Sequence, residues 1–265
     1  MTYVTTERRG GVQIIRYGNP PHGYLCRAGC EELRQAFEDC AGDPDLRVIV
    51  FTGASPTAFI HHFDIAEIIS VGEAIAAGLV GEDVFDGGDF SALLTGIAKS
   101  PKVVIAAING VCLAGGLELA LACDIRVAAH GVTEIGCPQT RTAVCGGTQR
   151  LPAVIGMGRA LDMILRGTIM DARRAVEIGL VNEAADDALA RALEIAGELE
   201  RLLPEVLAAA KVCARRPTEA ALPQGYALER KAFAGLLKDG RALDVLRAFQ
   251  AQGADLATFI PPAAA

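Results

Sequence analysis

The sequence predicts an α/β fold in which buried strands and helices alternate along one chain of 265 residues. Short apolar runs such as Arg47–Phe51 and Val103–Ala107 have the length and the β-branched content of buried strands. Segments with helical spacing separate these runs, and 51% of all residues are hydrophobic. A chain of this length and composition can build one large core, alone or with a small appendage.

The individual elements follow from local patterns. Gly11–Tyr17 alternates like a strand, and residues 19–23, rich in proline and glycine, form a turn after it. From Asp171 onward the pattern is helical. Between these regions the expected elements are, in chain order, a helix Glu31–Cys40, a strand Arg47–Phe51, a loop Phe59–Asp64, helical residues 73–98, a strand Val103–Ala107, a helix Leu117–Ala122 and a strand Ile125–Ala128.

Charge and composition argue against several classes of protein. The net charge of -7 comes without a basic stripe, which argues against a nucleic-acid partner. The longest apolar run, Val103–Ala129, is interrupted by Glu118, Asp124 and Arg126, so we expect no membrane span. The N-terminus has no apolar signal segment, and the eight cysteines show no C-x-x-C spacing. We therefore expect a cytoplasmic protein with reduced thiols and no metal site.

The segment Ala106–Asp124, AAINGVCLAGGLELALACD, carries the strongest functional signal. A buried strand ends in a turn, and a buried helix begins at Gly115-Gly116. Unpaired N–H groups and the helix dipole converge at such a start, and glycine allows a ligand oxygen to approach the backbone. This is how main chain builds an oxyanion hole, and Glu118 in the first turn is placed to act as an acid or base.

This segment resembles the signature of the crotonase (enoyl-CoA hydratase/isomerase) superfamily. Val48–Ile65, VIVFTGASPTAFIHHFDI, is similar to another signature of that family. Gly146–Leu151 and Gly179–Val181 match two later landmarks in order and spacing. The resemblance runs from about Gly11 to about Phe249, which is nearly the whole chain.

The resemblance implies a crotonase-like (ClpP/crotonase) spiral of ββα units with a C-terminal helical segment. Residues 1–200 would form the α/β core with the acyl-CoA site, and residues 201–265 a helical oligomerisation segment. The expected assembly is a homotrimer or a dimer of trimers. The coenzyme A would be carried by the substrate, so no separate cofactor is expected. An apolar stripe in the last segment, Leu228, Ala232, Phe233 and Leu236, is expected to be buried against the core or another subunit.

Carried onto this chain, the resemblance also assigns site residues. The backbone amides of Phe63 and Gly115 would form the oxyanion hole, and Glu118 matches the first of two catalytic glutamates. Gln139 stands where the hydratases have the second, and an amide cannot exchange protons as a carboxylic acid does. Beside the oxyanion position, His62 is a candidate for proton chemistry. The expected substrate-binding residues are Ala58, Asp64, Ile65 and Gly116.

Other departures from the family pattern leave the reaction open. Glu134 is a less favoured substitute for the missing acid, because a strand-surface position suits it better. Basic residues found in many relatives are replaced by Ala66 and by Gln252-Gly253. We expect an enoyl-CoA hydratase/isomerase-type enzyme. The alternatives are a crotonase-type decarboxylase or hydrolase, and a catalytically silent acyl-CoA binding protein.

Overall fold

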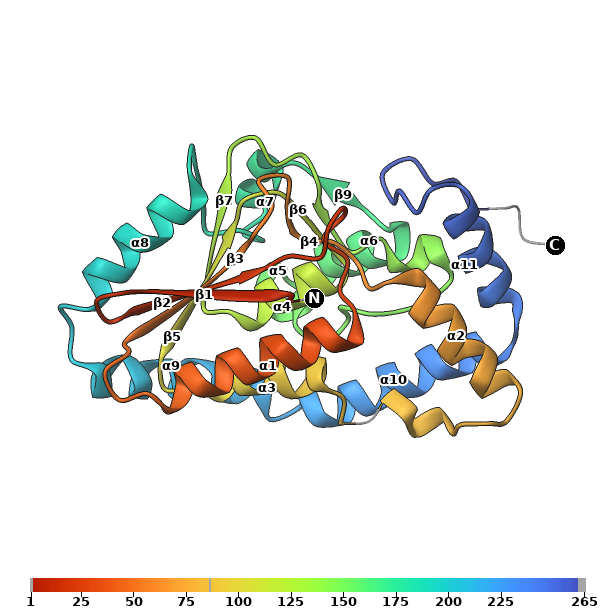
Figure 1. The fold of residues 1–265 in the computed structure, drawn as a ribbon, viewed down its shortest axis with the longest axis horizontal. Helices are drawn as coiled ribbons and strands as arrows, with labels where there is room; N and C mark the ends of the chain where they lie inside the picture. Colours follow the sequence, from red (N-terminus) through yellow and green to blue (C-terminus); the bar gives the residue numbers. More distant parts are fainter. Residues whose placement is uncertain (1, 86, 262–265) are drawn as a thin grey trace.

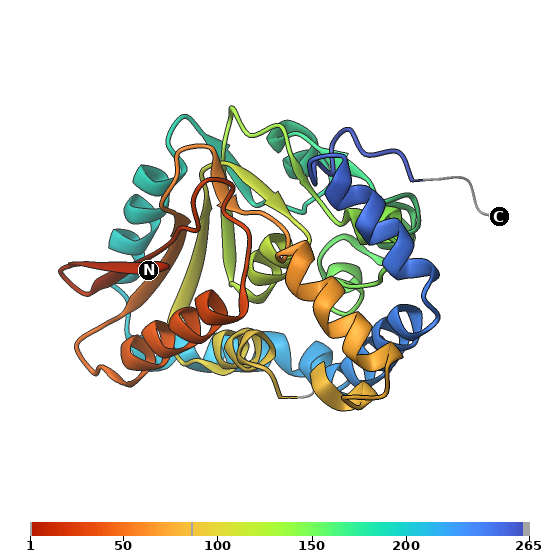
Figure 2. The same ribbon diagram turned by 45° about the vertical axis from the view of Figure 1, so that its right-hand side comes forward.

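The computed structural model, which describes residues 2–85 and 87–261, contains two sheets enclosed by helices (Figures 1 and 2). The larger sheet has the strand order β1-β2-β3-β5-β7-β10, antiparallel between β1 and β2 and parallel elsewhere. Parallel strands are joined by helical crossovers, and these helices bury both faces of the sheet. The sequences of the strands are therefore apolar without interruption. Its strands are β1 (Val4–Arg9), β2 (Val12–Tyr17), β3 (Val48–Gly53), β5 (Val103–Ile108), β7 (Ile125–Ala129) and β10 (Glu183–Ala185).

A smaller sheet pairs the short strands that follow each central strand. Its order is β4-β6-β8-β9. The chain thus repeats one unit: a long strand in the large sheet, a short strand in the small sheet, then a helix. This repeat confirms the predicted spiral of ββα units. The elements concerned are β4 (Ala58–Ile60), α2 (Ile65–Ala76), β6 (Val111–Leu113), α4 (Gly115–Ala122), β8 (Ile135–Gly136), the 3-10 segment η2 (Pro138–Thr142) and β9 (Ile169–Met170).

Helices cover the two faces of the large sheet. On one face, Leu33 and Phe37 of α1 (Arg27–Gly42) and Ile97 of α3 (Asp89–Lys99) share a core with Phe51. On the other face, the small residues of α8 (Ala188–Leu199) lie in a cluster with the valines of β3. Further helical segments are η1 (Glu82–Phe85), α5 (Leu151–Ile155), α6 (Met157–Arg166) and α7 (Ala172–Glu177).

The C-terminal helices fold back onto the core. After α9 (Pro204–Glu219), α10 (Leu222–Lys238) and α11 (Arg241–Ala251) pack against α2, toward the right-hand side of the view in Figure 1. Their shared core includes Ile69, Leu237 and Phe249. At Gly72, an added Cβ would lie 2.5 Å from a methyl carbon of Leu243, so glycine permits this close approach of α2 and α11. None of the helices in the described ranges is both long and apolar enough to cross a membrane.

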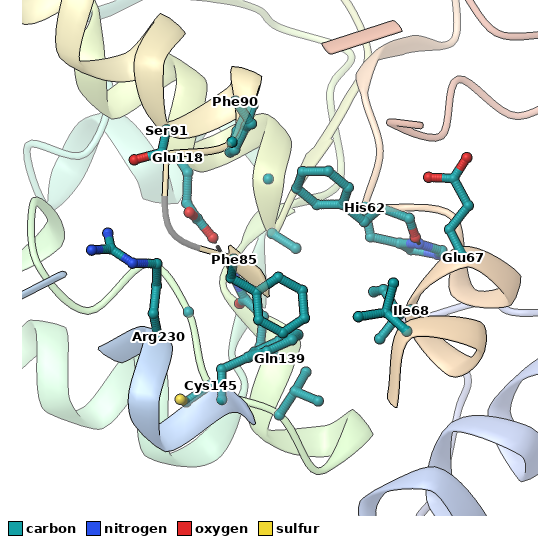
Figure 3. Close-up of a pocket in the computed structure, with 18 of the residues that line it drawn as sticks. His62, Glu67, Ile68, Phe85, Phe90, Ser91, Glu118, Gln139, Cys145 and Arg230 are labelled. Carbon is teal, nitrogen blue, oxygen red and sulfur yellow. Dashed lines mark hydrogen bonds between the residues drawn. The ribbon is translucent and has the colours of Figure 1, made fainter. Parts of the chain in front are cut away.

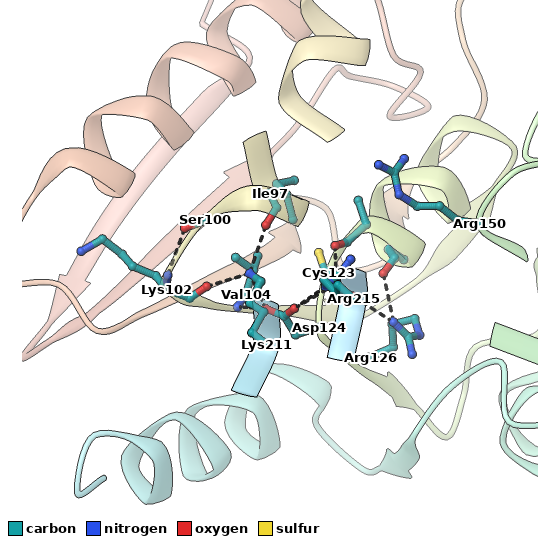
Figure 4. Close-up of polar contacts among 12 residues, drawn as sticks. Ile97, Ser100, Lys102, Val104, Cys123, Asp124, Arg126, Arg150, Lys211 and Arg215 are labelled. Carbon is teal, nitrogen blue, oxygen red and sulfur yellow. Dashed lines mark hydrogen bonds and ion pairs between the residues drawn. The ribbon is translucent and has the colours of Figure 1, made fainter. Parts of the chain in front are cut away.

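A buried ionic cluster fixes α9 (Figure 4). The Asp124 carboxylate lies 2.8 Å from the Lys211 ammonium and 2.9 Å from the Arg215 guanidinium. Arg215 and Arg126 also donate to the backbone carbonyl of Cys123, just after α4 ends. These cations satisfy carbonyls that the helix geometry leaves unpaired.

The structure confirms the α/β core and corrects several local expectations. The short strands β4, β6, β8, β9 and β10 were not predicted, because two or three residues carry no periodicity of their own. The expected burial of the stripe on α10 is wrong within one chain: Leu228 is 70% exposed and Leu236 41% exposed. The face of α10 turned inward carries Ala234 and Leu237 instead. Burial of the stripe in another subunit stays a prediction, as does the role of residues 201–265 in assembly.

Candidate functional site

A cavity of about 410 Å³ lies between the N-terminal end of α4 and the C-terminal helix α10. Most of its wall is apolar, with Ile68 and Val71 from α2, Phe85 and Phe90 from the following segment, and Phe233 from α10. Glu118 and Gln139 bring polar atoms to its inner end (Figure 3). A mostly apolar cavity with a few convergent polar groups is the usual form of a small-molecule site.

Glu118 is the strongest acid–base candidate in this cavity. It belongs to the first turn of α4, and the Gln139 side-chain amide donates to its Oε1 at 3.1 Å (Figure 3). Burial, followed by the negative charge of Glu229, raises the pKa of Glu118 to about 8, against the opposing effect of Arg150. The carboxyl group is therefore neutral at pH 7 and able to donate a proton.

Phe63 and Gly115 lie beside each other at the cavity. A Cβ added to Gly115 would lie 3.1 Å from a ring carbon of Phe63, and both residues line the cavity. The amide of Asp64 donates to Leu25 O, and that of Gly116 donates to His61 O. Among the backbone hydrogen bonds of the described residues, the amides of Phe63 and Gly115 have no acceptor. Two unpaired amides at one cavity are the parts from which an oxyanion hole is made.

The backbone just before Gly115 is strained. Ala114 has φ 48° and ψ -113°, although an L-residue with a side chain avoids positive φ. Such a conformation costs on the order of 1–3 kcal/mol and is found mostly where a functional site requires it. Here it redirects the chain between β6 and α4. Gly116 is also constrained, because an added Cβ would lie 2.0 Å from Ile60 O.

The structure separates the sequence-predicted site residues into two groups. Those that line the cavity are Phe63, Ile65, Gly115, Glu118, Gln139 and His62. Ala58 lies buried in β4, and Asp64 caps α2 by accepting from the Ala66 amide at 2.8 Å. Neither residue, nor Gly116 or Glu134, is among the described residues that line the cavity. The substrate-binding roles of Ala58, Asp64 and Gly116 stay predictions.

His62 is held by the protein on both sides of its ring. Its Nδ1 lies 2.6 Å from Phe63 O and its Nε2 lies 3.2 Å from Ala254 O. The ring stacks on Tyr24 with 4.5 Å between ring centroids, and burial lowers the pKa of His62. Both ring nitrogens face backbone carbonyl oxygens, and a neutral imidazole can donate to only one of them. Because both nitrogens are engaged by the protein, this geometry favours a structural role in shaping the Phe63 loop.

Three polar residues at the site were missed by the sequence-based prediction. Glu229 and Tyr226 come from α10 and line the cavity, and Arg150 lies behind it at the start of α5. The Arg150 guanidinium donates to the Tyr226 hydroxyl and lies 5.2 Å from the centroid of its ring. Helical spacing alone could not reveal these residues, because only the return of α10 onto the core brings them to the site.

Comparison with known proteins identifies the family. Residues 7–250 match the family model for enoyl-CoA hydratase/isomerase. The chain is 36% identical to the putative enoyl-CoA hydratase/isomerase YngF of Bacillus subtilis, covering 82% of this chain and 83% of that protein. It is 33% identical to human mitochondrial methylglutaconyl-CoA hydratase, covering 82% of this chain and 65% of that protein.

A solved structure agrees with this placement. The crystal structure of an enoyl-CoA hydratase from Bacillus anthracis superposes with a TM-score of 0.72 at 30% identity, covering 95% of this chain and 97% of that one. The fold, the signature around Gly115 and the family match therefore all indicate the same family. The chain belongs to the enoyl-CoA hydratase/isomerase family and is an acyl-CoA enzyme with the crotonase fold.

Proposed function

We propose that this enzyme adds water to a 2-enoyl-CoA thioester, with Phe63 and Gly115 as the oxyanion hole and Glu118 as an acid–base group. The observation that carries the proposal is the arrangement at one cavity of two unpaired amides and a carboxyl group. The amides would bind the thioester oxygen, on which negative charge grows as the enolate forms. Donors fixed in place before the reaction stabilise such charge without reorganisation.

Glu118 would supply the proton at the α-carbon. Its pKa of about 8 keeps the carboxyl protonated at neutral pH, and an acid with a pKa near the working pH transfers protons most effectively. The Gln139 amide, which donates to the Glu118 carboxyl, would fix the direction of that proton. Loss of such a group typically reduces turnover by 10²- to 10⁴-fold.

Isomerisation of a 3-enoyl-CoA is the second candidate. The observation that favours it is Gln139, because a reaction that only moves a proton between two carbons needs one carboxyl group. In that reaction Glu118 would remove a proton from the α-carbon and return it at the γ-carbon. The two candidates differ in whether water is consumed, which a product analysis separates.

The apolar walls favour an apolar acyl group. Ile68, Val71 and Phe85 offer contacts to hydrocarbon chains, and burial of each methylene is worth about 0.8 kcal/mol. We expect coenzyme A to enter as part of the substrate and no other cofactor to be needed. Adding a chelator to the assay should leave turnover unchanged.

We also propose a homotrimer or a dimer of trimers in the cytoplasm. Met157, Leu161 and Leu165 form an apolar stripe on α6 and are 61%, 46% and 71% exposed in the single chain. Exposed apolar stripes of this kind usually mark protein–protein contacts. All eight cysteines are free, which suits a reducing compartment. Light scattering that gives the mass of one chain would contradict the oligomer.

A panel of coenzyme A thioesters tests the reaction. Crotonyl-CoA reports hydration, a 3-enoyl-CoA reports isomerisation, and a malonyl-type CoA reports decarboxylation or hydrolysis. We expect crotonyl-CoA to give the 3-hydroxyacyl product and His62→Ala to retain most of that activity. Absence of turnover with every member of the panel, together with tight binding of the thioesters, would replace this proposal with a silent acyl-CoA binder.

A further inference from the structure

Addition of water to an enoyl thioester needs two proton transfers, and Glu118 can perform only one of them at a time. One group must take a proton from the attacking water while another delivers a proton to the α-carbon. Gln139 can hold a water molecule by hydrogen bonding but cannot accept its proton. A second carboxylate at the cavity would complete this chemistry.

Glu229 of α10 supplies a carboxylate at this cavity. It lines the same cavity as Glu118, although the two residues are 111 positions apart in sequence. The backbone amide of Thr148 donates to its Oε2 at 2.8 Å, and the Thr148 hydroxyl contacts the same oxygen. The hydrogen bonds of the described residues include none to the other carboxylate oxygen, Oε1.

One short loop, residues 145–148, connects the two carboxyl groups. At Gly146 an added Cβ would lie 3.1 Å from Glu118 Oε1, and at Gly147 it would lie 3.8 Å from Glu118 Cγ. On the other side, Cys145 Sγ lies 3.7 Å from Glu229 O, and Thr148 holds the Glu229 carboxylate. The absence of a side chain at Gly146 lets the loop lie close to the Glu118 carboxyl group.

The approach of α10 to this loop is also close. A Cβ added at Gly225 would lie 1.7 Å from Oε1 of Gln149, the residue that follows the loop, so glycine at this position lets the first turn of α10 lie against that residue. Glu229 follows one helical turn later on the same face of α10. The position of Glu229 is therefore set by packing and by two contacts from Thr148.

We propose that Glu229 is the second acid–base carboxylate of the hydration site and accepts a proton from the attacking water. The water oxygen bonds to the β-carbon, and one water proton passes to Glu229. The electron pair of the carbon–carbon double bond moves toward the thioester as an enolate, which then takes the Glu118 proton at the α-carbon. Transfer of the proton from Glu229 to Glu118 through solvent restores the enzyme, so the net change is the addition of one water.

The electrostatics of the site support this pairing. The negative charge of Glu229 is the second-largest cause, after burial, of the raised pKa of Glu118. The other groups that act on Glu118 are Arg150 at the start of α5, the Gln139 amide from η2 and the backbone around Gly147. Two carboxyl groups with different environments can hold different protonation states at one pH, which is the usual basis for separate acid and base roles.

This assignment rests on the hydration reaction proposed above, and Glu229→Gln tests it. Glutamine keeps an oxygen that accepts from the Thr148 amide, so the loop contact survives while the charge is lost. We expect kcat for crotonyl-CoA hydration to fall about 10²-fold with KM changed less than threefold. Thr148→Val is the matched control: it removes the hydroxyl contact, keeps the Glu229 charge, and should cost less than tenfold.

Two further measurements distinguish a catalytic Glu229 from one that only anchors the loop. Exchange of the α-proton of a saturated acyl-CoA in D2O needs the oxyanion hole and Glu118, so Glu229→Gln should retain it while losing hydration. This exchange decreases toward low pH, as the Glu118 carboxylate becomes protonated. The pH of the decrease should be lower in Glu229→Gln, because removing a negative charge lowers the pKa of Glu118. The double variant Glu229→Gln/Gln139→Glu should hydrate crotonyl-CoA at least tenfold faster than Glu229→Gln does.

The possible outcomes separate the two proposals. Hydration by Glu229→Gln within threefold of the unmodified enzyme would overturn the role of Glu229 and leave the proposed function intact. Equal loss of hydration and proton exchange, with no rescue by Gln139→Glu, would reduce Glu229 to a structural anchor. An unmodified enzyme that neither hydrates crotonyl-CoA nor exchanges the α-proton would overturn the proposed function and the role of Glu229 with it.

Discussion

The two ends of α4 handle buried charge in opposite ways. At the C-terminal end, Asp124 is paired with both Lys211 and Arg215, and cationic side chains satisfy the last carbonyls of the helix (Figure 4). At the N-terminal end, Glu118 makes no ion pair with any described residue, and another carboxylate raises its pKa. The carboxylate at the C-terminal end therefore has counterions, whereas the carboxyl group at the N-terminal end has a perturbed pKa, as is common at functional sites.

The difference also separates stability from reactivity. The Asp124 carboxylate, paired with two cations, serves as an anchor for α9. The Glu118 carboxyl group, whose pKa is raised to about 8, can change its protonation state near neutral pH. We therefore expect substitutions at the C-terminal end to affect mainly the free energy of unfolding, and substitutions at the N-terminal end to affect mainly turnover.

The largest effect is expected for Asp124→Asn. The Lys211 side chain is only 6% exposed, so removing the carboxylate leaves buried positive charge without a counterion. The free energy of unfolding should fall by about 3–5 kcal/mol, as for other broken buried pairs. Urea unfolding followed by circular dichroism measures this change. A loss below about 1 kcal/mol would show that the cluster behaves like an exposed pair.

Glu118→Gln should reduce turnover and leave stability intact, in contrast to Asp124→Asn. The substitution keeps the shape of the side chain and removes the exchangeable proton, so kcat should fall about 10²-fold or more. The free energy of unfolding at pH 7 should not decrease, because the native carboxyl group is already neutral there. Steady-state kinetics with crotonyl-CoA and calorimetric binding of a saturated acyl-CoA measure the two quantities. Unchanged turnover would remove Glu118 from the mechanism.

The raised pKa of Glu118 predicts how stability depends on pH. Between the ordinary value of 4.5 and about 8, the folded protein holds a proton on Glu118 that the unfolded chain releases. Stability from this group is complete below pH 4.5 and is lost as the pH rises through 8, with a slope of up to about 1.4 kcal/mol per pH unit. Unfolding of the unmodified enzyme and of Glu118→Gln at pH 5, 6 and 7 should show this difference in slope. Parallel curves would contradict it.

The smallest effect is expected at an exposed pair. On α7, Glu177 pairs with Arg173 (i,i+4) and Arg174 (i,i+3), and the three side chains are 41%, 78% and 57% exposed. Glu177→Ala should change the free energy of unfolding by less than about 0.5 kcal/mol, because solvent and salt screen such pairs. The same urea experiment provides the reference for Asp124→Asn. A comparable loss at both positions would refute the distinction between buried and exposed pairs.

The fold class, and the placement of Gly115 and Glu118 at one helix end, could be predicted from the sequence alone. The runs at Val48 and Val103 are apolar on both faces, so they read as buried parallel strands without knowledge of their neighbours. Gly115 and Glu118 lie within four residues of each other on one helix. Their relation is therefore local, and helical geometry alone places both at the same helix end.

The contribution of α10 to the cavity could not be predicted in this way, because it depends on how the helices pack. Glu229 and Phe233 reach the cavity because α10 returns over α2, and no local pattern encodes a contact between segments so far apart in sequence. The same folding exposed Leu228 and Leu236 and turned Ala234 and Leu237 inward, since several faces of α10 carry apolar residues. The packing of α10 against α2 determines which face of α10 is buried. The same orientation places Glu229, a second carboxylate, at the cavity that Glu118 lines.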